Sequence, residues 1–214
     1  MKGQLSGVFV IEKQDRFIIL RKIKYAESDL IIQAMNTRGA KHSFIARGAL
    51  RSKKRFGGGI LEPLHFVSFT YQEKSDVTQL KILKEATLLE DFKEIRSDYD
   101  RLDLALYVLN AVAHVSQEGD EGSEFLFNLT GHTLRTLRLS KNLNCIKLQF
   151  CLKFLYQQGV MSLEPWMAPF LKINMTDTDL LLEEASVIQS VENYLDSIDS
   201  LVTQYIKTAD AGFT

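Results

Sequence analysis

The residues best suited to chemistry lie in one short segment, RGALRSKKRFGGGILEP at positions 47–63, which holds five arginines and lysines. Phe56 and three consecutive glycines follow these cations directly, and the segment ends at Pro63. Cations on a flexible backbone beside an aromatic ring suit the recognition of a nucleic acid, because the cations contact phosphates while the ring stacks on a base. Phe56, next to Gly57, is therefore the predicted exposed stacking residue. The competing interpretation is an ordinary solvated surface loop.

A second set of cations comes from the elements that precede this segment. Three of them stand near the end of a predicted strand, two flank a predicted hairpin turn, and residues 21–55 as a whole carry ten cations against two acidic residues. In a small barrel these positions can share one face, so we predict a common nucleic-acid-binding surface. Its predicted members are Arg21, Lys22, Lys24, Arg38, Lys41, Arg47, Arg51, Lys53, Lys54, Arg55 and Phe56.

Charge is distributed unevenly along the chain, although the net formal charge of the 214 residues is only −1. Residues 1–85 hold 16 Lys and Arg against 8 Asp and Glu, whereas residues 86–214 hold 10 against 19. This asymmetry suggests two domains, of which the first meets a polyanion. Every apolar run is far shorter than the roughly 20 residues needed to cross a bilayer, so we expect no membrane segment and a cytoplasmic location.

The spacing of apolar residues changes near residue 90. From Phe17 to about Glu90, short runs rich in Ile, Val, Phe, Tyr and Thr predict five strands with turns at 36–39 and 72–76, and residues 7–15 could add a strand ahead of them. After Asp91 the apolar residues fall three, four and seven apart, which predicts four or more amphipathic helices. We expect an α+β fold, in which a small closed or partly closed barrel precedes an all-α domain.

The other candidate sites have weaker patterns. The three glycines lack the Gly-Lys-Ser/Thr of a phosphate-binding loop, and the acids of segment 90–103 alternate with cations at helical spacing, which predicts salt links on a solvated helix. Cys145 and Cys151 are six residues apart in a predicted helix, so we expect both to be reduced and buried. The histidines have no metal-ligand spacing and are expected to be structural: His42, His65, His114 and His132. No catalytic residue, metal or cofactor is predicted.

The segment from Phe17 to Tyr71 resembles the N-terminal part of the bacterial RecO family of recombination and repair mediators. The similar features begin with a strand that ends in basic residues and continue with Tyr-x-Glu-x-Asp at 25–29 and a strand pair around Gly39. They end with Arg-Gly-Ala at 47–49, Arg51 and Lys53, and Phe-Gly-Gly at 56–58 leading to Leu-Glu-Pro at 61–63. Residues 146–160 are similar to a family helix that ends in a Leu-Gly turn.

The resemblance implies an OB-fold over residues 1–88 and a helical domain over residues 89–214. It also implies binding of single- and double-stranded DNA, annealing of complementary strands, recognition of the acidic C-terminal tail of single-stranded-DNA-binding protein, and cooperation with RecR in loading RecA. The resemblance further implies that the protein is located in the bacterial cytoplasm, in association with the nucleoid. The basic residues of the 47–55 motif and of the first strands then become DNA contacts. After Gly159, where many members place a four-cysteine zinc motif, this chain has no cysteine, so we predict no zinc.

The helical half has few cations that could take part in such recognition. Arg135 and Arg138 on one predicted helix, with Lys141 after it, could receive a short acidic peptide beside an apolar groove. The alternative is ordinary helix-surface charge. For the whole chain, the competing classes are an RNA-binding OB-fold protein and an interaction scaffold whose basic loop grips an acidic protein partner.

Overall fold

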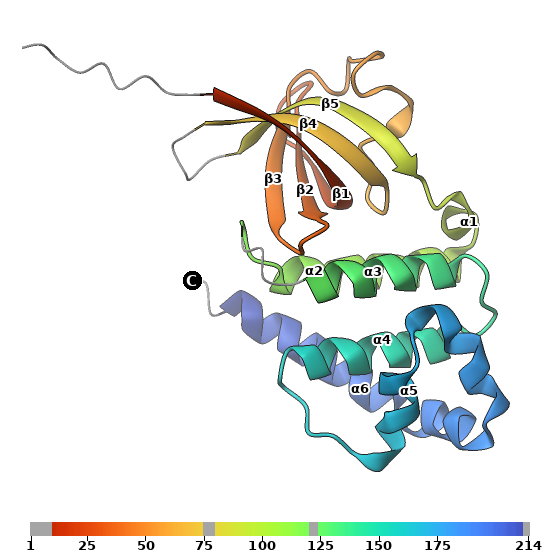
Figure 1. Ribbon diagram of the computed structural model, residues 1–214. Coiled ribbons are helices and arrows are strands. Elements are labelled where there is room, and N and C mark those ends of the chain that lie inside the picture. The colour runs from red at the N-terminus through yellow and green to blue at the C-terminus, as the bar shows by residue number, and fades with distance from the viewer. Residues whose placement is uncertain (1–9, 75–79, 120–123, 212–214) are drawn as a thin grey trace, which may run out of the picture. The chain divides into compact units, whose positions relative to one another are not determined.

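The computed structural model describes residues 10–74, 80–119 and 124–211 (Figure 1). The chain divides into two compact units with a boundary between residues 91 and 92, except that Glu118 and Gly119 belong to the first unit. The boundary lies a few residues beyond the end of the predicted barrel domain, because the last strand of the first unit continues to Glu90. No helix in the described ranges is long and apolar enough to cross a membrane.

The first unit is a closed barrel of five strands in the order β1-β2-β3-β5-β4. Only the β3–β5 pair is parallel, and the other four pairs are antiparallel. The predicted barrel is confirmed, and it is an OB-fold. The strands are β1 (Val10–Lys24), β2 (Leu30–Asn36), β3 (Lys41–Ala46), β4 (Phe66–Lys74) and β5 (Lys81–Glu90).

Two strand boundaries differ from the prediction because β1 pairs with a different strand at each end. Its first half pairs with β4 from Val10↔Lys74 to Ile18↔Phe66, and its second half pairs with β2 from Phe17↔Asn36 to Lys24↔Leu30. The residues predicted as an extra strand therefore continue into β1, with 7–9 outside the described residues. The pairing also extends β4 over 72–74, which was predicted as a connector, and 75–76 lie outside the described residues.

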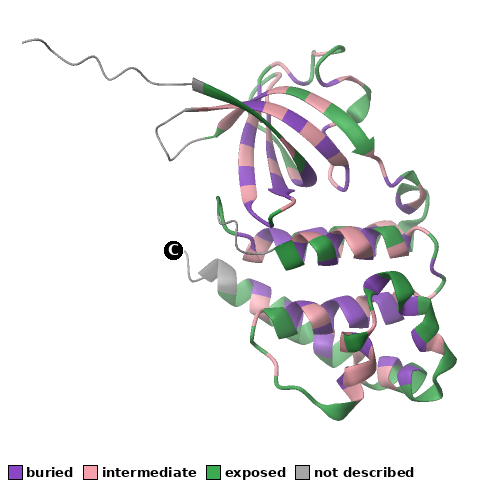
Figure 2. Ribbon diagram, viewed as in Figure 1, coloured by how far each residue is buried: buried purple, intermediate pink, exposed green. Residues whose placement is uncertain are grey.

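Aromatic rings fill the barrel. The ring of Phe17 lies 5.1 Å from that of Phe44 and 5.3 Å from that of Phe69, and Phe44 lies 5.2 Å from Tyr71. These rings come from three different strands, so each supports the others at the distances that aromatic pairs prefer. The alternation of buried and less buried positions along β3 brings every second residue into this core (Figure 2).

A segment from outside the five strands covers part of β3. The backbone N–H of Ser43 donates to Glu118 Oε1 at 3.0 Å, and its hydroxyl donates to Oε2 at 3.1 Å. The N–H of Gly119 donates to the carbonyl of Lys41 at 3.0 Å. Since β5 pairs with β3 only at Phe44 and Ile45, this segment bonds the part of β3 that β5 does not reach.

The second unit is helical, as predicted. Its helices are α1 (Lys93–Arg96), α2 (Tyr99–Val115), α3 (Glu124–Leu137), α4 (Leu143–Gln157), α5 (Ala168–Lys172) and α6 (Ala185–Ala211), with short 3₁₀ segments at Pro165–Met167 and Met175–Glu183. The side chain of Asp98 accepts from the Arg101 N–H at the start of α2, and Asn142 does the same for Cys145 at the start of α4. Both are ordinary N-caps.

The helix α4 contributes a buried face that includes both cysteines. Cys145 and Cys151 are free thiols and fully buried, as predicted. Burial in an apolar setting raises the pKa of Cys145 to about 11 and that of Cys151 to about 12, so both stay protonated and unreactive at neutral pH.

One buried amide on α4 holds the segment that follows it. Gln149 is completely buried, and its Nε2 donates to the carbonyls of Phe170 at 3.1 Å and Ile173 at 2.9 Å. Its Oε1 accepts from the hydroxyl of Thr178 at 2.5 Å. A single side chain thus satisfies polar groups from α5 and the 3₁₀ segment beyond it.

Gln149→Leu should destabilise the protein by about 3 kcal/mol or more, because the carbonyls of Phe170 and Ile173 lose the hydrogen bonds that Gln149 donates inside the core. Denaturant unfolding monitored by circular dichroism measures this change. Gln157→Leu is the matched control, since Gln157 is exposed at the end of the same helix and its replacement should stay within about 0.5 kcal/mol. Equal stability of the two variants would contradict the role assigned to Gln149.

Candidate nucleic-acid interface

The basic segment that follows β3 is fixed by hydrogen bonds to the β1–β2 connection. Asp29 Oδ1 accepts from the backbone N–H of Gly48 at 2.8 Å, and the Leu50 N–H donates to the Ser28 carbonyl at 3.0 Å. Gly48 has φ +64°, a left-handed conformation in which glycine is unstrained. The Tyr-x-Glu-x-Asp and Arg-Gly-Ala motifs therefore meet in space, with the aspartate holding the turn.

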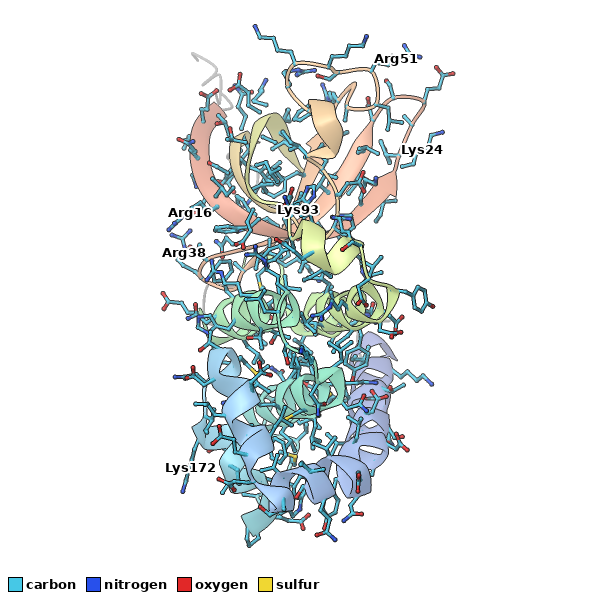
Figure 3. The ribbon with its side chains drawn as sticks, turned by 90° about the vertical axis from the view of Figure 1, so that its right-hand side faces the viewer. Arg16, Lys24, Arg38, Arg51, Lys93 and Lys172 are labelled. Carbon is cyan, nitrogen blue, oxygen red and sulfur yellow. The ribbon has the colours of Figure 1, made fainter. Side chains whose placement is uncertain are left out.

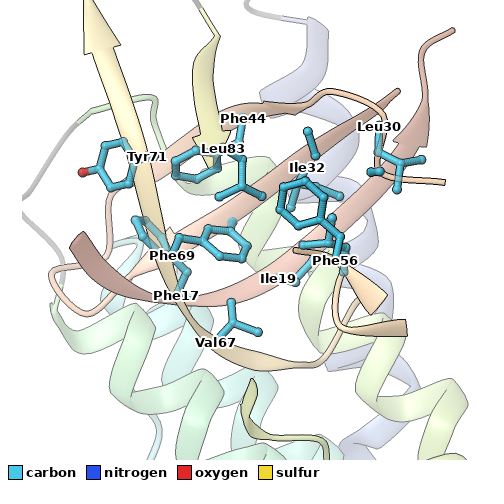
Figure 4. Close-up of a cluster of buried hydrophobic side chains, with 14 residues drawn as sticks. Phe17, Ile19, Leu30, Ile32, Phe44, Phe56, Val67, Phe69, Tyr71 and Leu83 are labelled. Carbon is cyan, nitrogen blue, oxygen red and sulfur yellow. The ribbon is translucent and has the colours of Figure 1, made fainter. Parts of the chain in front are cut away.

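Phe56 is buried, and the prediction that it is an exposed stacking residue is wrong. Its side chain is only 5% exposed and belongs to the barrel core together with Ile19, Leu30 and Ile32 (Figure 4). The Arg55 guanidinium lies 5.1 Å from the centre of the Phe56 ring, on the outer side of this core. The ring works as an anchor that holds the cations around it on the surface.

Seven of the predicted cations gather at one end of the barrel. Strand register sets Lys24 opposite Leu30 and Leu30 opposite Ala46, so the end of β1, the start of β2 and the end of β3 coincide. Arg51 and Lys24 lie toward the same end of the barrel in Figure 3. We call this group the basic end; it consists of Lys22, Lys24, Arg47, Arg51, Lys53, Lys54 and Arg55, all exposed.

Arg38 and Lys41 do not share that end, so the prediction of one common surface is wrong for these two residues. They flank the β2–β3 turn, at the opposite end of β2 from Leu30, which is about 20 Å away at the usual rise per residue. Arg38 lies near Arg16 in Figure 3, and its guanidinium is 3.4 Å from Asp15. Arg21 is half-buried. In the β1–β2 strand pairing its backbone lies opposite Gln33, between the two ends of the barrel.

Carboxylates neutralise part of the basic end. Lys22 Nζ contacts both oxygens of Glu62, at 2.5 and 2.6 Å, and Arg51 contacts Glu27 at 3.4 Å. The Arg55 guanidinium donates to the carbonyl of Arg47 at 3.1 Å, which ties the two ends of the basic segment together. Ion pairs this exposed contribute about 0–1 kcal/mol, so another anion can replace the carboxylates at small cost.

A hollow of about 340 Å³ opens beside the Lys22–Glu62 pair. Its lining includes these two residues, Lys53, Leu50, Phe56 and the glycines 57–59. Gly58 and Gly59 have φ values of +69° and +72°, and a Cβ on Gly58 would meet nothing within 4 Å. The glycine run therefore leaves this side of the hollow open.

The sequence offers four aromatic residues near the cations, Phe17, Tyr25, Phe44 and Phe56, and the structure exposes Tyr25 rather than the favoured Phe56. Tyr25 follows Lys24 directly and is 62% exposed, whereas the other aromatic candidates, Phe17, Phe44 and Phe56, are all buried. Leu50 is also exposed beside the cations. The position of Tyr25 just after the basic end of a strand was the sequence signal that could have indicated an exposed ring. Tyr25 replaces Phe56 as the candidate for base stacking.

The candidate peptide site in the helical unit is partly occupied by an internal ion pair. Arg138 Nε and Nη2 donate to the two carboxylate oxygens of Glu94, at 3.1 and 2.9 Å, and this guanidinium lowers the pKa of Glu94. Arg135 is exposed on α3, whereas Arg138, predicted on the same helix, lies in the turn just after α3 ends at Leu137. Lys141 lines a separate hollow of about 570 Å³ with Lys147 and two aspartates. The acidic segment 90–103 thus forms salt links, but one of them, from Glu94 to Arg138, reaches the turn that follows α3.

Two of the four histidines, His42 and His65, make side-chain hydrogen bonds within the barrel unit. His65 Nδ1 donates to the Ile60 carbonyl at 2.9 Å, and the His42 ring contacts Asn36 and Lys81. Burial and the neighbouring ammonium of Lys81 lower the pKa of His42 to about 4, so it is neutral at pH 7. Within the described ranges, no group of three or more His, Cys, Asp or Glu side chains could hold a metal ion.

Comparison with known proteins relates the barrel to one family. Residues 10–92 match the family model described as "Recombination protein O N terminal". The chain is 34% identical over 142 residues to the DNA repair protein RecO of Syntrophobacter fumaroxidans, which covers 66% of this chain and 55% of that protein. It is 38% identical over 111 residues to the RecO protein of Syntrophus aciditrophicus, covering 52% and 42%.

A third relative, the DNA repair protein RecO of Maridesulfovibrio salexigens, is 32% identical over 151 residues, covering 70% of this chain and 59% of that protein. The chain therefore spans about half the length of the curated relatives it matches. The resemblance predicted from the motifs at 25–29, 47–49 and 61–63 is confirmed.

Separate replacement of Phe56 and Tyr25 should distinguish a role in protein stability from a role in nucleic-acid binding. Phe56→Ala should cost about 3–5 kcal/mol of stability, because it empties a core position. Tyr25→Ala should leave stability within about 0.5 kcal/mol and weaken binding of a single-stranded oligonucleotide by about 1–3 kcal/mol. Thermal unfolding and fluorescence anisotropy measure the two effects. Loss of stability in Tyr25→Ala, or unchanged affinity, would contradict this assignment.

Proposed function

We propose that this chain, whose residues 10–92 belong to the N-terminal domain of the RecO family, binds DNA at the basic end of its barrel and acts in DNA repair and recombination. The observation that carries the proposal is the clustering of seven exposed cations around a loop fixed by Asp29 and Phe56. The names of its relatives, DNA repair protein RecO, support the same function.

The proposed mechanism is electrostatic capture without covalent chemistry. Cations of the basic end replace the counterions condensed on a DNA backbone, and the release of these ions drives binding. The exposed ring of Tyr25 and the neighbouring Leu50 offer apolar surface to unpaired bases. Two complementary strands concentrated on one basic surface repel each other less, so base pairing completes their annealing. Single strands and duplexes both present the phosphates that this surface needs.

The finer parts of the proposal follow from the family. They are recognition of the acidic tail of single-stranded-DNA-binding protein, cooperation with RecR, and loading of RecA onto covered single strands, in the bacterial cytoplasm near the nucleoid. The competing classes, an RNA-binding protein and a scaffold for acidic proteins, differ in ligand preference. Filter binding of single-stranded DNA, RNA and heparin at matched salt separates them.

Changing Arg51, Lys53, Lys54 and Arg55 together to Ala should weaken DNA binding and flatten its salt dependence. On a single strand, the slope of log affinity against log salt should fall by roughly 0.7 for each phosphate that these cations no longer neutralise. Anisotropy titrations of a labelled oligo-dT across a salt series measure this slope.

The matched control for this variant carries the same charge change in the helical unit. Four exposed cations there are replaced by Ala: Lys93, Arg96, Lys172 and Lys207. This control should keep the wild-type slope, apart from a small long-range effect that salt screens. Equal slopes in the two quadruple variants would remove the basic end from the binding site.

Arg135→Ala combined with Arg138→Ala should weaken binding of an acidic tail peptide about tenfold or more, because hydrogen bonds between charged groups are removed. Glu94→Gln should strengthen binding of the same peptide, since it releases Arg138 from its internal partner. Isothermal titration calorimetry measures both effects, with Lys172→Ala plus Lys207→Ala as the control. Wild-type affinity in the arginine variant would reject this site.

A further inference from the structure

The hollow at the basic end has the features of a site for one nucleotide. Its volume of about 340 Å³ falls near the lower end of the range of small-molecule pockets, about 300–1,000 Å³. Its lining combines the cations Lys22 and Lys53 with apolar surface from Leu50 and Phe56. A nucleotide needs this combination, because its phosphate is anionic and its base is flat and largely apolar on its faces.

The carboxylate of Glu62 occupies the position beside Lys22 where the phosphate of a ligand would bind. Both oxygens of Glu62 contact Lys22 Nζ, at 2.5 and 2.6 Å, and the side chains of Glu62 and Lys22 are 36% and 32% exposed. A phosphate offers the same ammonium equivalent oxygens. Since the existing pair is accessible to water, it is weak enough to exchange its carboxylate for a ligand anion.

The glycine run provides access to this pair. Three glycines without side chains line the hollow next to Glu62, and Gly58 is exposed. Its left-handed φ favours glycine, and the space where a Cβ would project is open. Gly58 therefore contributes no side chain that would obstruct a base at this side of the hollow.

We propose that this hollow receives one unpaired nucleotide of a bound strand, with its phosphate displacing Glu62 from Lys22 and its base entering beside the glycines. This inference rests on the proposed DNA binding and specifies one subsite within it. Glu62 then acts as an internal competitor: it keeps Lys22 neutralised until a strand with an accessible base replaces it. A base-paired duplex cannot place a base in the hollow, so the site favours single strands.

Glu62→Gln tests the inference, because it removes the competing charge and keeps the size of the side chain. Affinity for oligo-dT should rise roughly threefold or more at low salt, and the salt slope should steepen by about 0.7, since Lys22 then exchanges a counterion for a phosphate. The control is Glu27→Gln, which makes the same charge change at the same end, on the exposed partner of Arg51 outside the hollow. Thermal unfolding of each variant verifies that the fold is kept.

Three comparisons decide the outcome. The excess gain of Glu62→Gln over Glu27→Gln should disappear with an abasic strand of equal length, with a blunt duplex, and in a Lys22→Gln background. Equal gains for the two variants on every ligand would overturn the inference and leave DNA binding in place. An excess that persists on the abasic strand would also overturn it. Failure of the wild-type protein to bind any oligonucleotide would overturn the proposed function, and this subsite with it.

Discussion

The arrangement of the candidate interface depends on the burial of one ring. Phe56 lies in the barrel core, and its burial fixes the loop so that the cations before it lie on the surface at the end of the barrel. Asp29 fixes the other side of the same loop through Gly48. A charged loop without such anchors would lose entropy on binding, whereas a loop held at two points presents its cations already in place.

Much of the barrel could be predicted from the sequence, because each strand carries its own local pattern of apolar residues. The placement of the cations could not, because it depends on pairing between distant segments. Lys24 and Arg38 are close in sequence, yet β2 runs between them and separates them by its whole length. Phe56 next to Gly57 has the local signature of an exposed ring. Only the path of the loop across the barrel end shows that the ring points inward.

The helical unit illustrates the same limit. Amphipathic spacing correctly predicted helices, and the six-residue separation of the two cysteines within one of them led to the correct expectation that both are buried free thiols. Arg138 looked available for a ligand, but Glu94 lies more than forty residues away in the chain and pairs with it. The hydrogen-bond partners of Gln149 could not be predicted from the sequence either, since all three lie beyond the end of its own helix. Local patterns determine elements, and long-range partners determine which side chains remain available.

The contact of Glu118 and Gly119 with β3 means that the barrel is discontinuous in the chain. A fragment cut at the end of the family match, at residue 92, would lack this segment and leave the backbone of Lys41 and Ser43 without these partners. Such an open strand edge invites pairing with another molecule. The excised barrel would therefore tend to self-associate, and a fragment that retains residues through α2 and the segment after it would keep the edge covered.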